Sequence, residues 1–254
     1  MPEHSFHTPL PLTLEVAIPA GDIDVDTVDG EQSTVVVSGD ERLLESLEVR
    51  HDGNRIVVEL RGKSKFGFVV AFGSQVFGNA GLRVKARIPH GSGVKVKTAS
   101  ADTEIAGRIA ELDVNSVSGD LRVRGEIAGD ARVKTVSGDA ELGRVGRDLS
   151  LQGVSGDVRT GPIGGSVETK TVSGDVHVAA VSAGQARFAS VSGDIEIGIA
   201  QGSFLDVDAG STSGDLSSEV ALVSERLEGE NGAAPTVVVR GRTVSGDLRV
   251  FRAR

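Results

Sequence analysis

The stretch that decides the fold is Thr135-Val-Ser-Gly-Asp-Ala140, which returns almost unchanged as Thr171-Val-Ser-Gly-Asp-Val176. Copies or close variants of Val-Ser-Gly-Asp end at Asp40, Asp120, Asp139, Asp157, Asp175, Asp194, Asp215 and Asp247. A degenerate copy ends at Asp102, and from there to Asp194 successive copies are 18 or 19 residues apart. A weaker turn, such as Gly129-Asp130, lies midway between copies. This spacing indicates an internal structural repeat.

The residues after each turn alternate between apolar and polar, as in Leu121-Arg-Val123 and Ile195-Glu-Ile197. Alternation with period 2 predicts short strands with one buried face. Strands this short are stable only when they stack on similar neighbours. Gly reaches φ > 0 at the turn without steric cost, and Asp can accept hydrogen bonds from nearby amides. The sequence therefore predicts an all-β chain, a single-chain β-solenoid with coils of 18–19 residues.

The repeat divides the chain into three parts. We expect residues 99–215 to form the regular solenoid, residues 1–98 an irregular β region and cap, and residues 216–254 a C-terminal irregular coil or cap. The 18-residue gap between Asp22 and Asp40 suggests two further coils near the N-terminus. Solenoid ends need atypical segments that cover open strand edges, so both irregular regions are expected to be caps.

Composition excludes several function classes. The chain has no Cys, which removes disulfides, thiolate metal sites and a cysteine nucleophile. Its net charge of −9 argues against a nucleic-acid partner. No apolar stretch reaches the length of a membrane helix, and the first residues lack a leader pattern. We therefore expect a cytoplasmic protein, with peripheral membrane association left open.

The repeated Thr-Val-Ser-Gly-Asp motif resembles the DUF4097 family of bacterial β-strand-repeat proteins, described as putative adhesins. Ala20-Gly-Asp-Ile-Asp-Val25 and Arg87-Ile-Pro-His-Gly-Ser-Gly-Val94 add to the resemblance, which extends over nearly the whole chain. It implies a β-solenoid with no established catalytic residues.

The first candidate site is the row of turn aspartates. If the coils stack in register, neighbouring carboxylates lie about 4.8 Å apart and could attract Ca²⁺. One Asp per coil supplies few ligands, and the alternative is that each Asp accepts a backbone hydrogen bond in its turn. No cofactor is expected. The candidate metal ligands are Asp120, Asp139, Asp157, Asp175 and Asp194.

The second candidate site is a basic, Phe-rich segment at residues 62–81, which holds four of the eight Phe residues. Between Arg61 and Ala101 there are eight Lys or Arg and no Asp or Glu, so this stretch carries +8 and the rest of the chain −17 (−9 − 8). Three interpretations remain open: a cap, a self-association contact, or a loop that docks on an anionic membrane or partner. The candidate residues are Lys63, Lys65, Phe66, Phe68, Phe72 and Phe77.

These observations predict a non-catalytic scaffold or binding protein that presents a repetitive surface to a protein partner, to a second copy or to the cell envelope. The alternatives are a peripheral membrane protein that uses residues 62–81 and a self-assembling solenoid. An enzyme is not expected, because the sequence has no nucleophile elbow or phosphate loop. A carbohydrate-active β-helix enzyme is the remaining catalytic option. It would use the outward residues Arg122, Glu141, Arg159, His177 and Glu196, although ordinary charge pairing between coils also explains that row.

Overall fold

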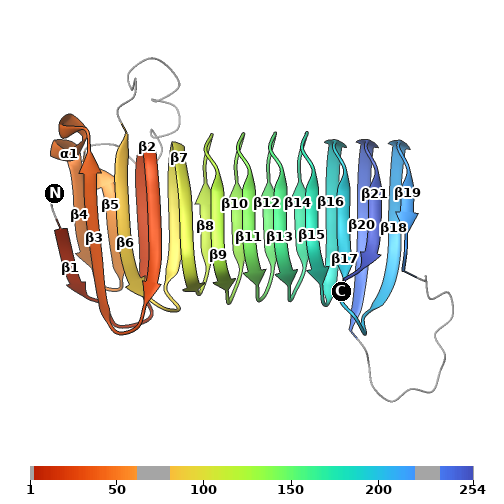
Figure 1. Ribbon diagram of the computed structural model, residues 1–254, viewed down its shortest axis with the longest axis horizontal. Helices are drawn as coiled ribbons and strands as arrows, with labels where there is room; N and C mark the ends of the chain where they lie inside the picture. Colours follow the sequence, from red (N-terminus) through yellow and green to blue (C-terminus); the bar gives the residue numbers. More distant parts are fainter. Residues whose placement is uncertain (1–2, 62–80, 221–234, 254) are drawn as a thin grey trace. The chain divides into compact units, whose positions relative to one another are not determined.

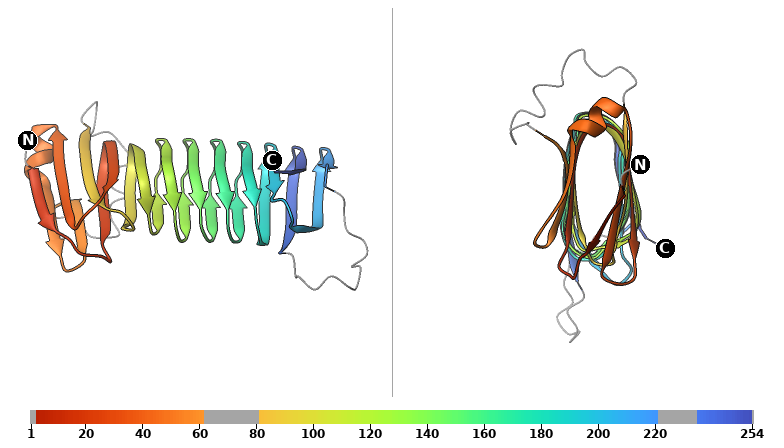
Figure 2. Two further views of the ribbon diagram at one scale, coloured as in Figure 1. Left: turned by 60° about the horizontal axis from the view of Figure 1, so that its bottom comes forward. Right: turned by 90° about the vertical axis from the view of Figure 1, so that its left-hand side faces the viewer.

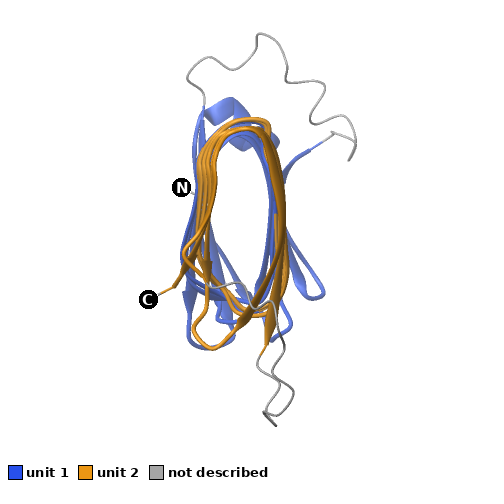
Figure 3. Ribbon diagram, turned by 90° about the vertical axis from the view of Figure 1, so that its right-hand side faces the viewer, with its two compact units in different colours: residues 1–128, 133–138 blue, residues 129–132, 139–254 orange. Residues whose placement is uncertain are grey.

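The protein is described by a computed structural model that covers residues 3–61, 81–220 and 235–253. It divides into two compact units, unit 1 (residues 1–128 and 133–138) and unit 2 (residues 129–132 and 139–254) (Figure 3). Within the described residues the regular secondary structure is β-strand, apart from a single six-residue helix. The all-β solenoid predicted from the repeat is confirmed in both units.

Unit 1 is built around two long strands that bend at a corner and so serve two sheets. In β2 (Thr13–Val28), the first half pairs in parallel with β5 (Arg55–Leu60) and the second half with β6 (Leu82–Pro89). Both halves also pair in parallel with β7 (Gly93–Ile109), the second bent strand (Figure 1). The strands β8 (Leu112–Asn115) and β9 (Leu121–Ile127) continue the two sheets beside β7.

Antiparallel strands complete unit 1. β3 (Gln32–Gly39) pairs with β6, and β1 (Glu3–His7) pairs with β3. On the other sheet, β4 (Leu47–Asp52) pairs with β5. β10 (Ala131–Lys134) contributes residues to both units.

The motif copy that ends at Asp40 is not a solenoid corner. Asp40 is the N-cap of α1 (Glu41–Ser46), where its Oδ1 accepts hydrogen bonds from the amides of Arg42 at 3.0 Å and Leu43 at 3.3 Å. The strand before it, β3, runs antiparallel to its neighbour. The expectation of two coils up to Asp40 is therefore wrong. Aspartate caps a helix as readily as it closes a turn, so spacing alone did not separate the two roles.

Unit 2 consists of parallel coils whose strands lie on two opposite sheets (Figure 2). Sheet A has the order β12–β14–β16–β20–β18, and sheet B has the order β11–β13–β15–β17–β21–β19. The strands are β11 (Ala140–Val145), β12 (Leu149–Gln152), β13 (Val158–Ile163), β14 (Val167–Lys170), β15 (Val176–Val181), β16 (Gly184–Ser192), β17 (Ile195–Ile199), β18 (Phe204–Ser213), β19 (Leu216–Ser218), β20 (Thr236–Ser245) and β21 (Leu248–Arg252).

The last coil in the sequence does not lie last in the stack. β20 is inserted between β16 and β18, and β21 between β17 and β19. β21 places the buried Val250 beside the exposed Ser218 of β19, while β18 carries Asp206 and Asp208. The more apolar coil thus takes the interior position. Residues 216–254, expected to form a C-terminal cap, supply both the outer strand β19 and the inserted coil.

Aliphatic side chains stack in rows between the sheets. Val158, Val176, Ile195 and Leu248 are register neighbours, and each is at most 5% exposed. Burying one such side chain contributes roughly 1.5–3 kcal/mol to the stability of the fold. Each coil adds one side chain to the row. No helix in the described part of the chain has the length and hydrophobicity needed to cross a bilayer.

Candidate interaction surface

The Val-Ser-Gly-Asp turns of unit 2 connect sheet A to sheet B along one edge. We call this edge, made of residues 153–157, 171–175, 190–194, 211–215 and 243–247, the corner edge. Glycine is required at four of the five corners because φ is positive there, for example +113° at Gly174. A Cβ on Gly174 would also lie 2.8 Å from the carbonyl carbon of Gly156 in the neighbouring coil. The corners can therefore stack closely only without a side chain at this position.

The corner aspartates form a ladder of hydrogen bonds with the backbone amides of neighbouring coils. Asp175 donates its N–H to Oδ1 of Asp157 at 3.0 Å, and its own Oδ1 accepts the N–H of Asp194 at 2.9 Å. The same bond joins Asp139 to Asp157, Asp194 to Asp247, Asp247 to Asp215 and, in unit 1, Asp102 to Asp120.

The structure therefore gives the predicted metal candidates a backbone role. Asp139, Asp157, Asp175 and Asp194 each use Oδ1 as an acceptor for the next corner amide, and Asp120 donates its own amide to Asp102. No group of three or more His, Cys, Asp or Glu is placed to hold a metal ion within residues 3–61, 81–220 and 235–253.

A hydroxyl side chain closes three of the five corners locally. Thr171 Oγ1 donates to the carbonyl oxygen of Ser173 at 3.0 Å, and Ser190 Oγ donates to that of Ser192 at 3.1 Å. Thr243 makes the same bond. The hydrogen bond spans the valine between the two residues, so it holds the backbone on both sides of that valine.

The valine of each corner is exposed. Nine large apolar side chains of the described residues are exposed, and six of them are corner valines, so this exposure is a property of the repeat. In unit 2 the exposed fractions are 45% for Val154, 47% for Val172, 48% for Val191 and 51% for Val244. Val117 and Val136 are the corresponding residues of unit 1. The corner edge thus carries a row of carboxylates, one per coil, beside a row of apolar side chains that ends at Thr212 in the outermost coil.

Sequence reasoning missed these valines, because an apolar residue next to a strand is expected to be buried. The available signal was its constant place inside a turn motif, two residues before the turn glycine. The residue before the valine is buried at Thr171, Ser190 and Thr243, so the valine has the outward orientation of the strand alternation.

The residues of the Phe-rich segment, Lys63, Lys65, Phe66, Phe68, Phe72 and Phe77, lie outside the described residues. The flanking strands show where the segment is attached. β5 ends at Leu60 and β6 begins at Leu82, both beside the bend of β2 at residues 18–21. This bend is aligned with Ser100 and, through it, with the corner at Ser118. The described ends that flank the segment, Leu60 and Leu82, therefore lie on the corner side of unit 1.

The outward charges of sheet B form pairs between coils. His177 Nδ1 lies 3.0 Å from Glu196 Oε2, and Arg249 lies 3.8 Å from Glu196 and 2.5 Å from Glu219. The hydrogen bond from Arg249 to Glu219 raises the pKa of the arginine further. Opposite charges in adjacent strands account for this row as surface pairing.

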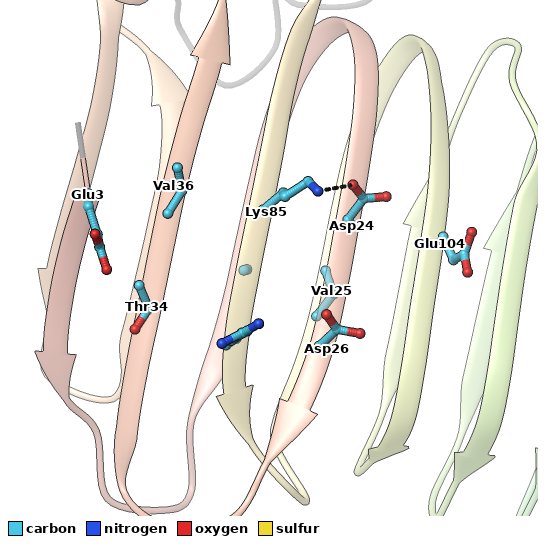
Figure 4. A pocket seen from close by; sticks show the side chains of 10 residues that line it. Glu3, Asp24, Val25, Asp26, Thr34, Val36, Lys85 and Glu104 are labelled. Carbon is cyan, nitrogen blue, oxygen red and sulfur yellow. Dashed lines mark ion pairs between the residues drawn. The ribbon is translucent and has the colours of Figure 1, made fainter. Parts of the chain in front are cut away.

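Unit 1 has a hollow of about 450 Å³ beside β1, β3, β6, β2 and β7 (Figure 4). Its lining mixes the carboxylates of Glu3, Asp24, Asp26 and Glu104 with Lys85 and Arg87. Lys85 Nζ lies 4.0 Å from Asp24 Oδ2, and Arg124 lies 2.8 Å from Glu104. These ion pairs neutralise part of the acidic lining.

Parallel coils, glycine corners and a ladder of aspartate–amide hydrogen bonds define a β-solenoid of the strand-repeat class. The chain belongs to the Toastrack DUF4097 family, whose model matches residues 12–250. Solved structures with a similar fold include a putative adhesin from Bacteroides fragilis (10% identity, TM-score 0.53, 97% of this chain and 95% of that chain covered). Another is a putative adhesin from Parabacteroides distasonis (12% identity, TM-score 0.54, 98% and 96% covered). At these identities the similarity concerns the fold. No curated protein matches the chain.

Proposed function

We propose that the protein is a non-catalytic scaffold that binds a protein partner through the corner edge of unit 2. The observation that carries the proposal is the repeated exposure of Val154, Val172, Val191 and Val244. Contiguous exposed apolar side chains mark interaction sites more often than isolated ones do. The pairing of outward charges on sheet B supports a structural role for that face.

The chemistry of the corner edge describes the partner. The row of carboxylates beside the valines favours a partner surface that combines apolar and basic side chains. Covering four half-exposed valines would contribute roughly 3–6 kcal/mol before the entropic cost of association. The valines alone are therefore insufficient for tight binding, and charge pairs or further contacts must add to them.

The test replaces the four valines by threonine, because Thr212 occupies the equivalent position in the outermost coil and the corner tolerates it. The variant is immobilised beside the wild-type chain and exposed to an extract of the producing organism. We expect the wild type to retain one or more proteins. The amount of each retained by the variant should be at least about tenfold lower. The matched control is Leu10→Thr/Leu216→Thr, which removes exposed apolar side chains outside the corner edge and should retain the same proteins.

Equal retention by the wild type and the valine variant would overturn the proposal. Co-sedimentation with phosphatidylserine vesicles examines the membrane alternative with the same proteins. Vesicle binding that is lost in Phe68→Ser/Phe72→Ser and unchanged in the valine variant would replace the proposal by peripheral membrane binding.

A further inference from the structure

The outer face of sheet A in unit 2 has a hollow of about 370 Å³ formed by β14, β16, β20 and β18. Its charged lining consists of Glu168, Lys170, Arg187, Asp208, Arg240 and Arg242. Ala189 lies between Lys170 and Arg242 in the strand register, so only a methyl group separates these two cations. We call this site the arginine hollow. It carries four cations and two carboxylates in a protein whose net charge is −9.

Both carboxylates of the arginine hollow are already paired with the flanking cations. Lys170 Nζ lies 2.7 Å from Glu168 Oε1, and this hydrogen bond lowers the pKa of Glu168. Arg242 lies 3.3 Å from Asp208 Oδ1. The two central guanidinium groups, those of Arg187 and Arg240, have no ion pair within 4 Å among the described residues.

Arg187 and Arg240 face each other in adjacent strands. They are register partners in the parallel pair of β16 and β20, and both are exposed. Like charges directly opposite each other destabilise a sheet. On sheet B of the same unit, by contrast, Glu196 separates His177 from Arg249. In the register each guanidinium group also has a carboxylate on its far side, Glu168 beside Arg187 and Asp208 beside Arg240. Those carboxylates form their ion pairs with Lys170 and Arg242, so an anion can bridge the two central guanidinium groups, which lie one strand spacing apart.

We infer that the arginine hollow binds a phosphate or sulfate group of a small soluble ligand, held between Arg187 and Arg240 and flanked by Lys170 and Arg242. A guanidinium group donates two parallel hydrogen bonds to such an oxyanion, and two neighbouring guanidinium groups can contact different oxygens of one tetrahedral group. The small side chain of Ala189 leaves room for the anion to approach the sheet. This inference goes beyond the proposed scaffold role, because the hollow lies on the face of sheet A and the corner edge lies between the sheets.

The test is an NMR titration of the ¹⁵N-labelled full chain at constant ionic strength, with inorganic phosphate, sulfate and glucose 6-phosphate as probes and acetate as the control anion. We expect saturable shifts in the amides of β16 and β20 for the tetrahedral anions, with dissociation constants on the order of millimolar because the site is exposed. Arg187→Gln and Arg240→Gln should each weaken binding about fivefold. Arg159→Gln, which removes an exposed arginine of sheet B, should leave binding unchanged.

Tighter binding of glucose 6-phosphate than of inorganic phosphate would identify a phosphorylated ligand, and equal binding would identify the free anion; either result supports the site. Shifts that do not saturate, or that persist unchanged in both arginine variants, would overturn it. A second readout is thermal stability. Added phosphate should raise the Tm of the wild type more than that of Arg240→Gln. An equal rise of the Tm in both chains on adding phosphate would contradict the argument.

Discussion

Replacing Gly174 by alanine perturbs the contact between neighbouring corners most directly. The new Cβ would lie 2.8 Å from the carbonyl carbon and 3.2 Å from the amide nitrogen of Gly156, and closer still to the carbonyl oxygen. These are backbone atoms, so the neighbouring coil has to move as a whole. Gly193 packs on Gly174 in the same way, so a displaced corner also disturbs the coil on its other side.

Two effects set the size of the loss. Alanine at φ +113° is strained by about 1–2 kcal/mol. A displaced coil also weakens the hydrogen bonds from Ser173 N–H to the carbonyl oxygen of Val154, at 2.8 Å, and from Asp175 N–H to Asp157, at 3.0 Å. Each contributes about 0.5–1.5 kcal/mol. We therefore expect Gly174→Ala to lower the free energy of unfolding by about 2–5 kcal/mol in total.

Gly202→Ala is the matched control within unit 2. Its φ is +79°, but a Cβ there would meet no atom within 4 Å, so only the strain of about 1–2 kcal/mol applies. Urea unfolding followed by circular dichroism compares the two variants with the wild type. Because repeat proteins can unfold in stages, hydrogen exchange at the amides of Ser173 and Asp175 should accompany it. Equal destabilisation by the two substitutions would refute the reasoning.

Three further substitutions probe the corner ladder, the charged face and the core. Asp175→Ala should lower the free energy of unfolding by about 1–2 kcal/mol. Asp175→Asn should lower it by less, because asparagine keeps an acceptor for the amide of Asp194. A rise in the Tm of the wild type on adding Ca²⁺ would instead favour a metal site. The folded-state pKa of Glu168 is lowered by Lys170, so this pair stabilises the fold above about pH 4.5 and the contribution is lost as the pH falls through the lowered pKa. In Lys170→Met the Tm should fall less steeply as the pH is lowered. An unchanged dependence of the Tm on pH would contradict the ion pair between Lys170 and Glu168. Phe188→Ala should lower the free energy of unfolding, measured by urea titration, by about 3–5 kcal/mol, because Phe188 lies on the buried face of sheet A and is only 3% exposed. A loss below about 1 kcal/mol would show that the core closes around the smaller side chain and leaves no cavity.

The regular coils were predictable from the sequence because each repeats the same local requirements. A glycine that adopts positive φ, an aspartate that accepts the next amide and a strand with alternating burial recur together from Asp139 to Asp194. Such local requirements leave a period in the sequence that can be read without knowing the fold.

The order of the coils was not predictable in the same way. The sequence places Asp215 directly after Asp194, but Asp247 lies between them in the ladder. Parallel coils with similar corners can stack in more than one order, and the choice depends on which coil buries more apolar surface. Val250 of the inserted coil is the register partner of Ser218 in the outer coil. This difference in hydrophobicity between paired residues does not appear in the spacing of the motif.

The candidate sites depend on that same order. Arg187 and Arg240 are 53 residues apart in sequence and meet only because β20 lies beside β16. The exposure of the corner valines likewise follows from the geometry of the edge between two sheets. Sequence reasoning therefore found the aspartates, which the turn chemistry explains, and missed the two features that arise from packing.

The most direct test of binding at the corner edge is methyl NMR of the valine-labelled chain with a captured partner. If the corner edge binds the partner, the γ-methyl signals of Val154, Val172, Val191 and Val244 will shift, while those of the buried Val237 and Val239 will stay in place. A partner that shifts signals elsewhere and leaves the four corner valines unchanged would contradict the proposed role of this edge.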